Sequence, residues 1–390
     1  MSTPHVRIAG AGMAGLTAAA ALGRLGWSVH VHERGTELRE IGAGIYMWEN
    51  GLRALEAVGA YDAVVANAEP VSSPELRDHK GRILQREWLR HRRLFTVGRQ
   101  HLHACLVDAA RATGAELVTN SPVASATAAG TLLLESGEEL SADLVIGADG
   151  IASKVRDSLG LLRKSVDLRD GGGRYMIPRN TDDPVGEVIE QWNGGRRIGI
   201  VPISRDFTYV FLCCRSDDEE GVDQAPFKAE TWIKSFPQFA SQISRIPEHS
   251  DGRWVRFRDV RTTGWHTGSA AILGDAAHGM SPNLGQAACV SMANAVGLAR
   301  SIEAHTTLEE ALATWERTER PITDGVQRYS RMYGRIGTRW PRWALGARSA
   351  LVRGIGAFEP VQRRINFAAT YFPEYAPPNT PAVGSAPPLH

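Results

Sequence analysis

The sequence contains few features that would place the protein outside the cell or on nucleic acid. It has only four cysteines in 390 residues, and none of them belongs to a C-x-x-C pair. Lys plus Arg number 44 and Asp plus Glu number 43, so no basic field indicates a nucleic-acid partner. We therefore expect reduced, buried thiols and a cytoplasmic location.

Long apolar runs and several catalytic signatures are also absent. No run of about eighteen apolar residues predicts a transmembrane helix, and the chain does not open with a basic region followed by an apolar segment. The sequence has no G-x-S-x-G motif of a serine hydrolase and no Cys/His cluster typical of a metal site. We therefore expect a soluble protein with no membrane partner and no metal, whose 43% hydrophobic residues can bury a sizeable core.

One phosphate-binding signature is present near the start of the chain. Gly10, Gly12 and Gly15 form G-x-G-x-x-G between an apolar strand expected at 6–9 and an Ala-rich helix expected at 16–25. Gly10 permits the tight turn, Gly12 lets a pyrophosphate approach the backbone, and Gly15 lets the helix pack on the strand. Because a helix N-terminus also attracts phosphate, this segment predicts a bound dinucleotide.

An acidic residue completes this signature. Glu33 ends the second expected strand, where its carboxylate can accept hydrogen bonds from ribose hydroxyls and would repel a 2′-phosphate. The other glycine-rich segments, at Gly42 and Gly171, lack the third glycine or the spacing. One dinucleotide is therefore expected to be held firmly.

Nucleotide-type segments alternate with sheet-rich segments along the chain. Short strand-like pieces between about 171 and 260 are separated by Gly, Pro, Asn and Asp, which predicts an antiparallel sheet. The fold class expected is α/β, with a Rossmann-like FAD-binding domain interleaved with an antiparallel β-sheet substrate domain and a helical C-terminal part. The expected FAD-binding domain comprises 1–72, 97–173 and 258–335, the substrate-binding sheet comprises 73–96 and 174–257, and a helix with a loose tail occupies 336–390.

Three further segments carry a family resemblance. They are "DLVIGADGIASKVRDSLG", with Asp149 and Gly150, "AAILGDAAHGMSPNLGQAACVSMANA", with Gly274 and Asp275, and "RQHLHACL", which Arg99 opens. Together they resemble the single-component (group A) FAD-dependent aromatic hydroxylases, the group of p-hydroxybenzoate hydroxylase, over roughly residues 5 to 335. The stretch "ELREIGAGIYMWENGLRALEAVGAYD" looks closest to the subgroup of 2-methyl-3-hydroxypyridine-5-carboxylate oxygenase.

The resemblance implies a reaction and a set of cofactors. A tightly held FAD, a transient NADH or NADPH, and O2 would hydroxylate a hydroxylated aromatic or heteroaromatic acid through a C4a-hydroperoxyflavin, with or without ring opening. The chain departs from the family pattern at Ala287–Cys289, where Gly-x-Asn is usual, and at Asn294, where Asp is usual. The expected FAD-binding residues are Gly10, Gly12, Met13, Ala14, Gly15, Glu33, Arg34, Gly44, Ile45, Arg99, Asp149, Gly150, Gly274, Asp275, Pro282, Gly285, Gln286 and Ala287.

Four residues are candidates for handling the substrate. Arg174 and Arg179 could clamp a ring carboxylate through a planar guanidinium, but they have opposite parity along a strand, so at most one should point inward. Tyr209 matches a pocket tyrosine of the pyridine oxygenase, and Tyr46 adjoins a glycine-rich segment. For each the alternative is a solvated charge or plain packing. The expected apolar roof consists of Trp192, Phe211, Trp254 and Phe257.

Other functions stay open at this point. An FAD-dependent phenol or nitrophenol monooxygenase, a flavoprotein dehydrogenase or reductase of the same fold, and an FAD-binding protein without turnover would share these motifs. The expected partner is a small aromatic substrate, and the expected assembly is a monomer or homodimer.

Overall fold

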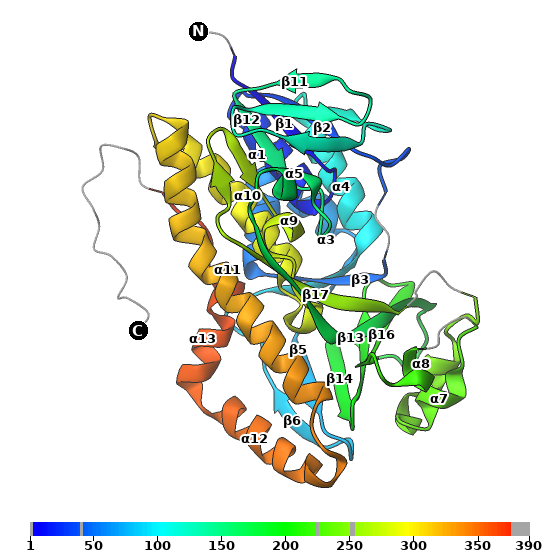
Figure 1. The fold of residues 1–390 in the computed structure, drawn as a ribbon. Helices are drawn as coiled ribbons and strands as arrows, with labels where there is room; N and C mark the ends of the chain where they lie inside the picture. Colours follow the sequence, from blue (N-terminus) through cyan, green and yellow to red (C-terminus); the bar gives the residue numbers. More distant parts are fainter. Residues whose placement is uncertain (1–2, 40–41, 223–225, 250–253, 376–390) are drawn as a thin grey trace.

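The computed structural model describes residues 3–39, 42–222, 226–249 and 254–375. The loose proline-rich tail expected near the C-terminus falls largely on 376–390, outside these residues. Two sheet-based halves lie one above the other, and the long helix α11 (Leu308–Thr338) runs along both of them (Figure 1). Among the described helices, none combines the length and the apolar character needed to cross a bilayer.

The upper half is built on a six-stranded sheet that begins with the nucleotide signature. Its strands, in spatial order, are β18 (His266–Thr267), β19 (Ala270–Ile272), β12 (Leu144–Gly147), β1 (His5–Ala9), β2 (Ser28–His32) and β8 (Glu116–Val118). All neighbours are parallel except β18 and β19. Because the carboxyl ends of parallel strands share one edge, the segments after β1, β2, β12 and β19 meet there.

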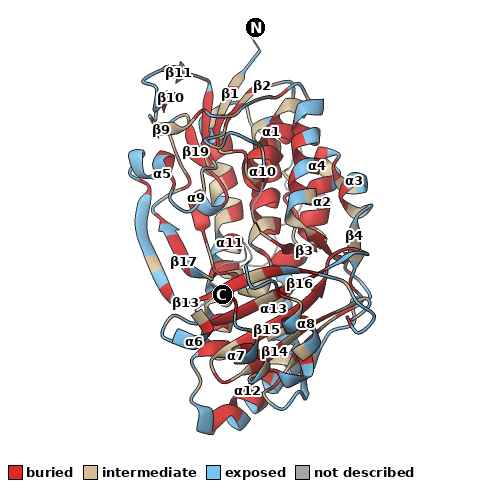
Figure 2. Cartoon of the chain, turned by 90° about the vertical axis from the view of Figure 1, so that its right-hand side faces the viewer, coloured by how far each residue is buried: buried red, intermediate tan, exposed pale blue. Residues whose placement is uncertain are grey.

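Small residues allow helices to pack closely around this sheet. The central helix α1 (Met13–Arg24) is rich in alanine, and its first ten residues are buried. It is accompanied by α4 (Arg99–Ala112) and α10 (Ala287–Ala304), and the interior of this half is almost wholly buried in Figure 2. The remaining helical elements of this half are α2 (Glu49–Val58), α3 (Tyr61–Val65), α5 (Lys154–Ser158), α9 (Asp275–His278) and the 3-10 turn η2 (Pro282–Leu284). Two small three-stranded sheets complete it. One consists of β3 (Gly44–Trp48), β7 (Leu94–Gly98) and β4 (Ala68–Pro70), and the other of β9 (Val123–Ala126), β10 (Thr131–Leu134) and β11 (Glu139–Ser141).

The lower half is built on a seven-stranded sheet. Its strands, in spatial order, are β17 (Val255–Thr262), β13 (Leu162–Pro178), β16 (Phe207–Arg215), β15 (Arg196–Pro202), β14 (Glu187–Asn193), β5 (Ser73–Arg77) and β6 (Ile83–Arg86). The neighbours are antiparallel, as the sequence predicts, with one exception: β14 and β5 are parallel. β5 comes from a distant part of the chain, so no tight hairpin fixes its direction.

Helices cover the lower sheet and join the two halves. The outer side carries α6 (Glu219–Val222), α7 (Ala229–Ile233), η1 (Pro237–Phe239) and α8 (Ala240–Ser244). Helix α11 is capped at its N-terminus by Thr307, whose side-chain oxygen accepts from the Glu310 amide at 3.3 Å. After it come η3 (Arg342–Ala344), α12 (Leu345–Ala357) and α13 (Glu359–Thr370).

The expected α/β fold class with a helical C-terminal part is therefore confirmed. The expected domain borders at 173 and 257 fall inside β13 and β17, which run without interruption through them. The two halves thus share continuous strands. The four cysteines are free and buried, as expected.

Candidate functional site

Three glycines define the turn after β1. Gly10 and Gly15 allow its tight backbone shape, and Gly12 leaves the backbone accessible to a ligand. Gly10 has φ +100°, and a Cβ there would lie 2.5 Å from the Ala148 carbonyl oxygen. A Cβ on Gly15 would lie 2.1 Å from the Gly10 oxygen. A Cβ on Gly12 would meet nothing within 4 Å, and helix α1 begins there without a side-chain cap. The amides of its first turn are therefore available to a ligand, while Met13 and Ala14 are buried.

The acidic residue after β2 lies directly under this turn. The Glu33 carboxylate accepts from the Ala11 amide at 2.9 Å and from the Gly35 amide at 2.8 Å. The next residue, Arg34, is exposed. The structure thus brings the turn and the carboxylate together, as the spacing in the sequence predicts.

The segment after β12 has a clear structural role. The Asp149 carboxylate accepts from the Lys154 amide at 2.8 Å and from the Ser153 hydroxyl, so it caps α5. Arg156, which is buried, donates to the carbonyl oxygens of Ile151 at 3.0 Å and Ala276 at 3.4 Å. The side chains of this motif therefore fasten the segments after β12 and β19 to each other, and Gly150 provides the positive φ of the connection.

The segment after β19 places an acidic residue at the same edge. Gly274 has φ +60° and lies so close to α1 that a Cβ would come within 2.9 Å of the Ala14 side chain. Asp275 follows it and is exposed. His278 is buried, which lowers its pKa to about 4, and its Nε2 lies 3.2 Å from the Asn294 amide nitrogen. Asn294, where the family usually has Asp, therefore lies within hydrogen-bonding distance of a neutral histidine side chain.

A cavity of about 330 Å³ lies between β3, the lower sheet, the start of α10 and the helices α11 to α13. Ten of the 22 residues that the sequence predicts to bind FAD or substrate line it. Those that line it are Gly44, Ile45, Tyr46, Arg99, Arg174, Tyr209, Pro282, Gly285, Gln286 and Ala287. Of the expected apolar roof, Trp192, Phe211 and Phe257 line the cavity, whereas Trp254 packs against Gly171.

The N-terminal end of α10 opens onto this cavity. The turn η2 is followed by Gly285, whose φ is +61° and where a Cβ would lie 3.0 Å from the Tyr46 ring. Gln286 then begins α10 without a side-chain cap, and its buried Oε1 has no hydrogen-bond partner among the described residues. The N-terminus of this 18-residue helix, which carries a partial positive charge, therefore faces the cavity. The unsatisfied Gln286 Oε1 lies at the same place.

Two tyrosines contribute hydroxyl donors to the cavity. Burial raises the pKa of Tyr209 to about 12, although Arg174 nearby acts to lower it. Burial also raises the pKa of Tyr46 well above its ordinary value. Gly44 makes room for Tyr209, because a Cβ there would lie 2.6 Å from the Tyr209 ring. Both phenols are therefore protonated at neutral pH and can donate to a ligand.

Sequence reasoning missed a buried ion pair in the wall of the cavity. Arg197 donates from Nε to Glu190 Oε1 at 2.8 Å and from Nη1 to Asn283 Oδ1 at 2.6 Å. The same carboxylate accepts from the Trp192 indole at 2.7 Å and from the Tyr333 hydroxyl at 2.9 Å. Burial acts against the charge of Arg197, but the Glu190 carboxylate raises its pKa above the ordinary value.

A signal for this pair was present in the strand pattern. In a strand, Glu190 and Trp192 share one face, and Arg196 and Arg197 must point to opposite faces. Arg196 pairs with Asp218 at 2.6 Å, so Arg197 is left to face the cavity. The hairpin register pairs Trp192 with Arg197, which brings the carboxylate and the guanidinium to one face.

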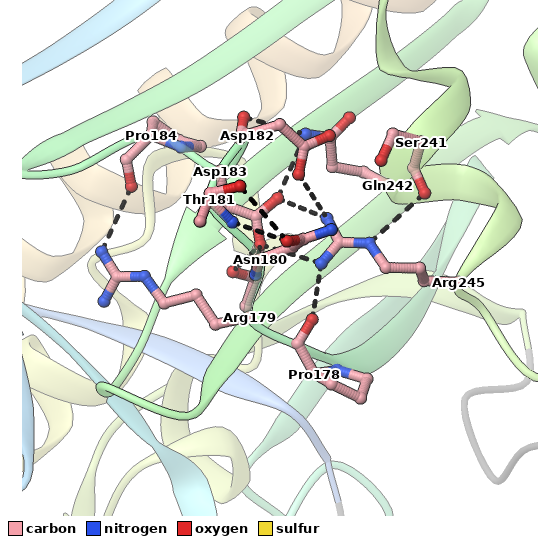
Figure 3. Close-up of polar contacts among 11 residues, drawn as sticks. Pro178, Arg179, Asn180, Thr181, Asp182, Asp183, Pro184, Ser241, Gln242 and Arg245 are labelled. Atoms are coloured by element: carbon pink, nitrogen blue, oxygen red, sulfur yellow. Dashed lines mark hydrogen bonds and ion pairs between the residues drawn. The ribbon is translucent and has the colours of Figure 1, made fainter.

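Of the two arginines expected to bind substrate, only Arg174 lines the cavity. Arg179 forms a two-pronged ion pair with Glu69 at 3.0 Å and donates to the Ser204 carbonyl oxygen at 2.8 Å. Figure 3 shows that Arg179 also donates to the Pro184 carbonyl oxygen, beside a turn in which Asp183 forms an ion pair with Arg245. The opposite parity of Arg174 and Arg179 thus separates them as expected, and Arg179 lies outside the cavity lining.

These features fit the FAD that the sequence predicts. The open turn at Gly12 and the uncapped start of α1 suit a pyrophosphate, and Glu33 and Asp275 offer carboxylates at the same edge. The uncapped start of α10 and the unsatisfied Gln286 oxygen suit the polar edge of a flavin. Within the described residues, no group of three or more His, Cys, Asp or Glu side chains is arranged to hold a metal ion.

Comparison with known proteins gives a consistent result. Residues 3–330 match the family described as FAD binding domain. A probable 2-heptyl-3-hydroxy-4(1H)-quinolone synthase of Rhodococcus erythropolis is 38% identical over 337 residues, which are 85% of this chain and 88% of that protein. A 2-heptyl-3-hydroxy-4(1H)-quinolone synthase of Mycobacteroides abscessus is 34% identical over 87% of this chain and 92% of that protein. The tetrameric form of 2-methyl-3-hydroxypyridine-5-carboxylic acid oxygenase has a TM-score of 0.85 and 34% identity, over 96% of this chain and 98% of that one.

Proposed function

This chain belongs to the FAD-binding domain family and is an FAD-dependent aromatic monooxygenase, and from that premise we propose that it hydroxylates a neutral, nitrogen-containing ring of the 2-alkyl-4(1H)-quinolone type. NADH or NADPH supplies two electrons. One atom of O2 replaces a ring hydrogen as a hydroxyl group, and the other leaves as water. The products are the hydroxylated ring and NAD⁺ or NADP⁺.

The residues that would hold FAD lie at the edge of the upper sheet. Amides of the turn from Gly10 to Gly15 would bind the pyrophosphate, Glu33 would accept from the ribose hydroxyls, and Asp275 would bind the ribityl chain. When bound, FAD supplies two-electron transfer and the activation of O2. Because the sequence has one dinucleotide turn, we propose that the nicotinamide binds only briefly.

The start of α10 would stabilise the reduced cofactor. Its first amides carry a partial positive charge, and Gln286 adds an acceptor for a ring N–H. A charge interaction of this kind is typically worth about 0.3–1 kcal/mol, and more where water is excluded. Phe211, Phe257 and Trp192 supply apolar walls that keep water from the reacting atoms.

The observation that carries the choice of substrate is that the buried cation of the cavity is already engaged. Arg197 is bonded to Glu190 and Asn283, so it would have to leave both to bind a substrate carboxylate. A neutral ring adds no unpaired charge to this apolar space. The Glu190 carboxylate has a remaining lone pair for a ring N–H, and Tyr209 would donate to a ring oxygen.

A second candidate substrate is a hydroxypyridine carboxylate, because the cavity contains a cationic side chain that could bind the carboxylate of such a ring. Arg174 lines the cavity beside Tyr209 and could bind a ring carboxylate in bidentate fashion. The similarity to the hydroxypyridine carboxylic acid oxygenase supports this choice.

For the state of assembly, we propose that the protein is a monomer or a homodimer.

Substrate-dependent oxygen consumption tests the proposal. The purified flavoprotein would be given NADH or NADPH together with 2-heptyl-4(1H)-quinolone, 2-methyl-3-hydroxypyridine-5-carboxylate, 4-hydroxybenzoate or 4-nitrophenol. We expect the quinolone to stimulate nicotinamide oxidation and O2 uptake by at least about tenfold, with a hydroxylated product. Stimulation by the carboxylates alone would favour the second candidate, and flavin reduction without a hydroxylated product would indicate a dehydrogenase or reductase.

A further inference from the structure

The cavity has a second end, which Trp192 and Tyr333 separate from the ion pair of Glu190 and Arg197 only by their own side chains. This end is bordered by the last turns of α11 and by α12 and α13, which lie beside β5 and β6 at the bottom of Figure 1. Its apolar lining consists of Leu76, Met332, Ile336, Val352, Ile355 and Ile365. Apart from Leu76, these residues follow position 330, where the match to the FAD-binding family ends.

Three polar side chains at this end form hydrogen bonds within the protein. Gln85 donates to the Val352 carbonyl oxygen at 2.9 Å, and Gln362 donates to the Ile355 carbonyl oxygen at 3.1 Å. The Tyr333 hydroxyl is bonded to Glu190. Among the described residues after 330 that line the cavity, none carries a charge. This end therefore offers a ligand mainly carbon atoms, with the Asn366 amide on α13 as a further polar group of the lining.

The helices that form this end are held in place by packing and by one buried arginine. Val352 packs with Leu76 and Trp192, and Ile336 is half-buried against them. Arg348, one turn before Val352, is fully buried and donates to the Gly194 and Gly337 carbonyl oxygens, both at 3.0 Å. Helix α12 is thus fixed to the β14–β15 hairpin and to the end of α11, so the apolar end is part of the folded protein.

We propose that this apolar end binds the alkyl side chain of the substrate while the ring lies between Glu190, Tyr209 and the start of α10. The inference rests on the proposed function and assigns the length preference for the chain to α12 and α13. An unbranched alkyl chain suits a space whose lining is mainly aliphatic side chains. Burial of one methylene group corresponds to about a fourfold gain in affinity.

A matched pair of residues on α12 allows a selective test. Ile355 lines the cavity, whereas Leu351, one turn earlier on the same helix, is 43% exposed and does not. The test compares Ile355→Trp with the control Leu351→Trp, and Ile365→Trp on α13 serves as an independent second variant. Each holoenzyme would be checked for bound flavin and for its melting temperature.

The measurement is kcat/KM for 2-methyl-, 2-butyl- and 2-heptyl-4(1H)-quinolone. In the unsubstituted enzyme we expect kcat/KM to rise by at least about tenfold from methyl to heptyl, since several methylene groups become buried. In Ile355→Trp and Ile365→Trp the heptyl compound should lose at least about tenfold and the methyl compound less than about twofold. Leu351→Trp should behave as the unsubstituted enzyme.

Two results would overturn this assignment. One is an equal loss for the methyl and heptyl compounds in both cavity variants, and the other is no dependence on chain length in the unsubstituted enzyme. If no quinolone is hydroxylated at all, the proposed function fails, and the apolar end is then judged by equilibrium binding of the same three compounds. Binding that strengthens with chain length and is weakened by Ile355→Trp supports the site, and binding independent of chain length refutes it.

Discussion

The edge that would bind the nucleotide and the cavity that would bind the ring are built by different means. At the edge, the shape depends on backbone: Gly10 and Gly15 leave no space for a side chain, and Gly12 opens the turn to a ligand. In the cavity, the polar character depends on side chains, above all on Glu190 and Arg197 of the β14–β15 hairpin and on Tyr333 of the distant helix α11. Substitutions should therefore act on cofactor binding in the first region and on stability and substrate handling in the second.

The largest effect is expected at the glycine turn, where two neighbouring positions should respond differently. Gly10→Ala combines a positive φ with a steric clash, so we expect it to unfold the turn and abolish FAD binding. Gly12→Ala meets no protein atom within 4 Å, so the unfolding free energy of the apoprotein should change by less than about 0.5 kcal/mol. Its FAD affinity should still fall at least about tenfold, because the methyl group enters the space of the pyrophosphate.

Urea unfolding of the apoproteins and fluorescence titration with FAD measure both quantities. The comparison between the two regions breaks down if Gly12→Ala binds FAD as tightly as the unsubstituted protein, or if it unfolds as readily as Gly10→Ala.

The next effect concerns the buried ion pair. Arg197→Met leaves the Glu190 carboxylate in the cavity wall without its cation, which typically costs about 3–5 kcal/mol of unfolding free energy. The double variant Glu190→Gln with Arg197→Met should recover much of this loss, since no uncompensated charge remains. Chemical denaturation of the three proteins measures the coupling, and additive losses would show that the two residues do not act as a pair.

A buried carboxylate that forms no ion pair with any described residue sharpens this contrast. Glu319 on α11 is 1% exposed and accepts from the hydroxyls of Tyr371 and Tyr375, and burial raises its pKa to about 7. The folded state therefore keeps a proton that the unfolded chain loses near pH 4.5, so this group makes stability fall as pH rises from about 4.5 to about 7.

The expected size of that fall is about 3 kcal/mol, and Glu319→Gln should remove it. Urea unfolding between pH 5 and pH 8 provides the measurement. We expect the glutamine variant to become increasingly more stable than the unsubstituted protein, in unfolding free energy, as the pH rises. Parallel pH profiles for both proteins would contradict the assignment.

The smallest effects should separate the two arginines of β13 and its turn. Arg174→Gln, inside the cavity, removes a charged hydrogen-bond partner of Tyr209, which would donate to the ring oxygen, so kcat/KM for the quinolone should fall by about tenfold, a loss of about 1.4 kcal/mol in transition-state binding. Arg179→Gln loses its contacts with Glu69 and Ser204 and should cost about 1–2 kcal/mol of stability while kcat/KM stays within about twofold. Steady-state kinetics and thermal unfolding of both variants test this, and a larger kinetic defect in Arg179→Gln would reverse the assignment.

The nucleotide edge could be predicted from the sequence because its determinants are local. The positions of Gly10, Gly12 and Gly15 follow from spacing alone, and Glu33 follows from the length of one strand–helix–strand unit. The parallel sheet then brings the segments after β12 and β19 to the same edge. The bond between the Asp149 carboxylate and the first amide of α5 could not be predicted in this way, because it depends on the path of the chain after β12.

The cavity could be predicted only in part because its determinants are far apart in the chain. Tyr209 was identified through resemblance to a family, Arg174 through the chemistry of carboxylate binding, and Tyr46 through its place beside a glycine-rich segment. All three line the cavity. The bond between Tyr333 and Glu190 joins α11 to β14 across 143 positions, and neither residue carries a local motif. The contribution of α12 and α13 could not be foreseen either, since helix patterns alone do not show which face meets the lower sheet.

The most direct test of the account is the origin of the oxygen in the product. The holoenzyme would convert 2-heptyl-4(1H)-quinolone with NADH or NADPH under ¹⁸O2, and the product would be analysed by mass spectrometry. The account predicts a single added hydroxyl group that carries ¹⁸O, formed in step with nicotinamide oxidation. A product whose new oxygen comes from water, or nicotinamide oxidation that yields only hydrogen peroxide and leaves the quinolone unchanged, would contradict it.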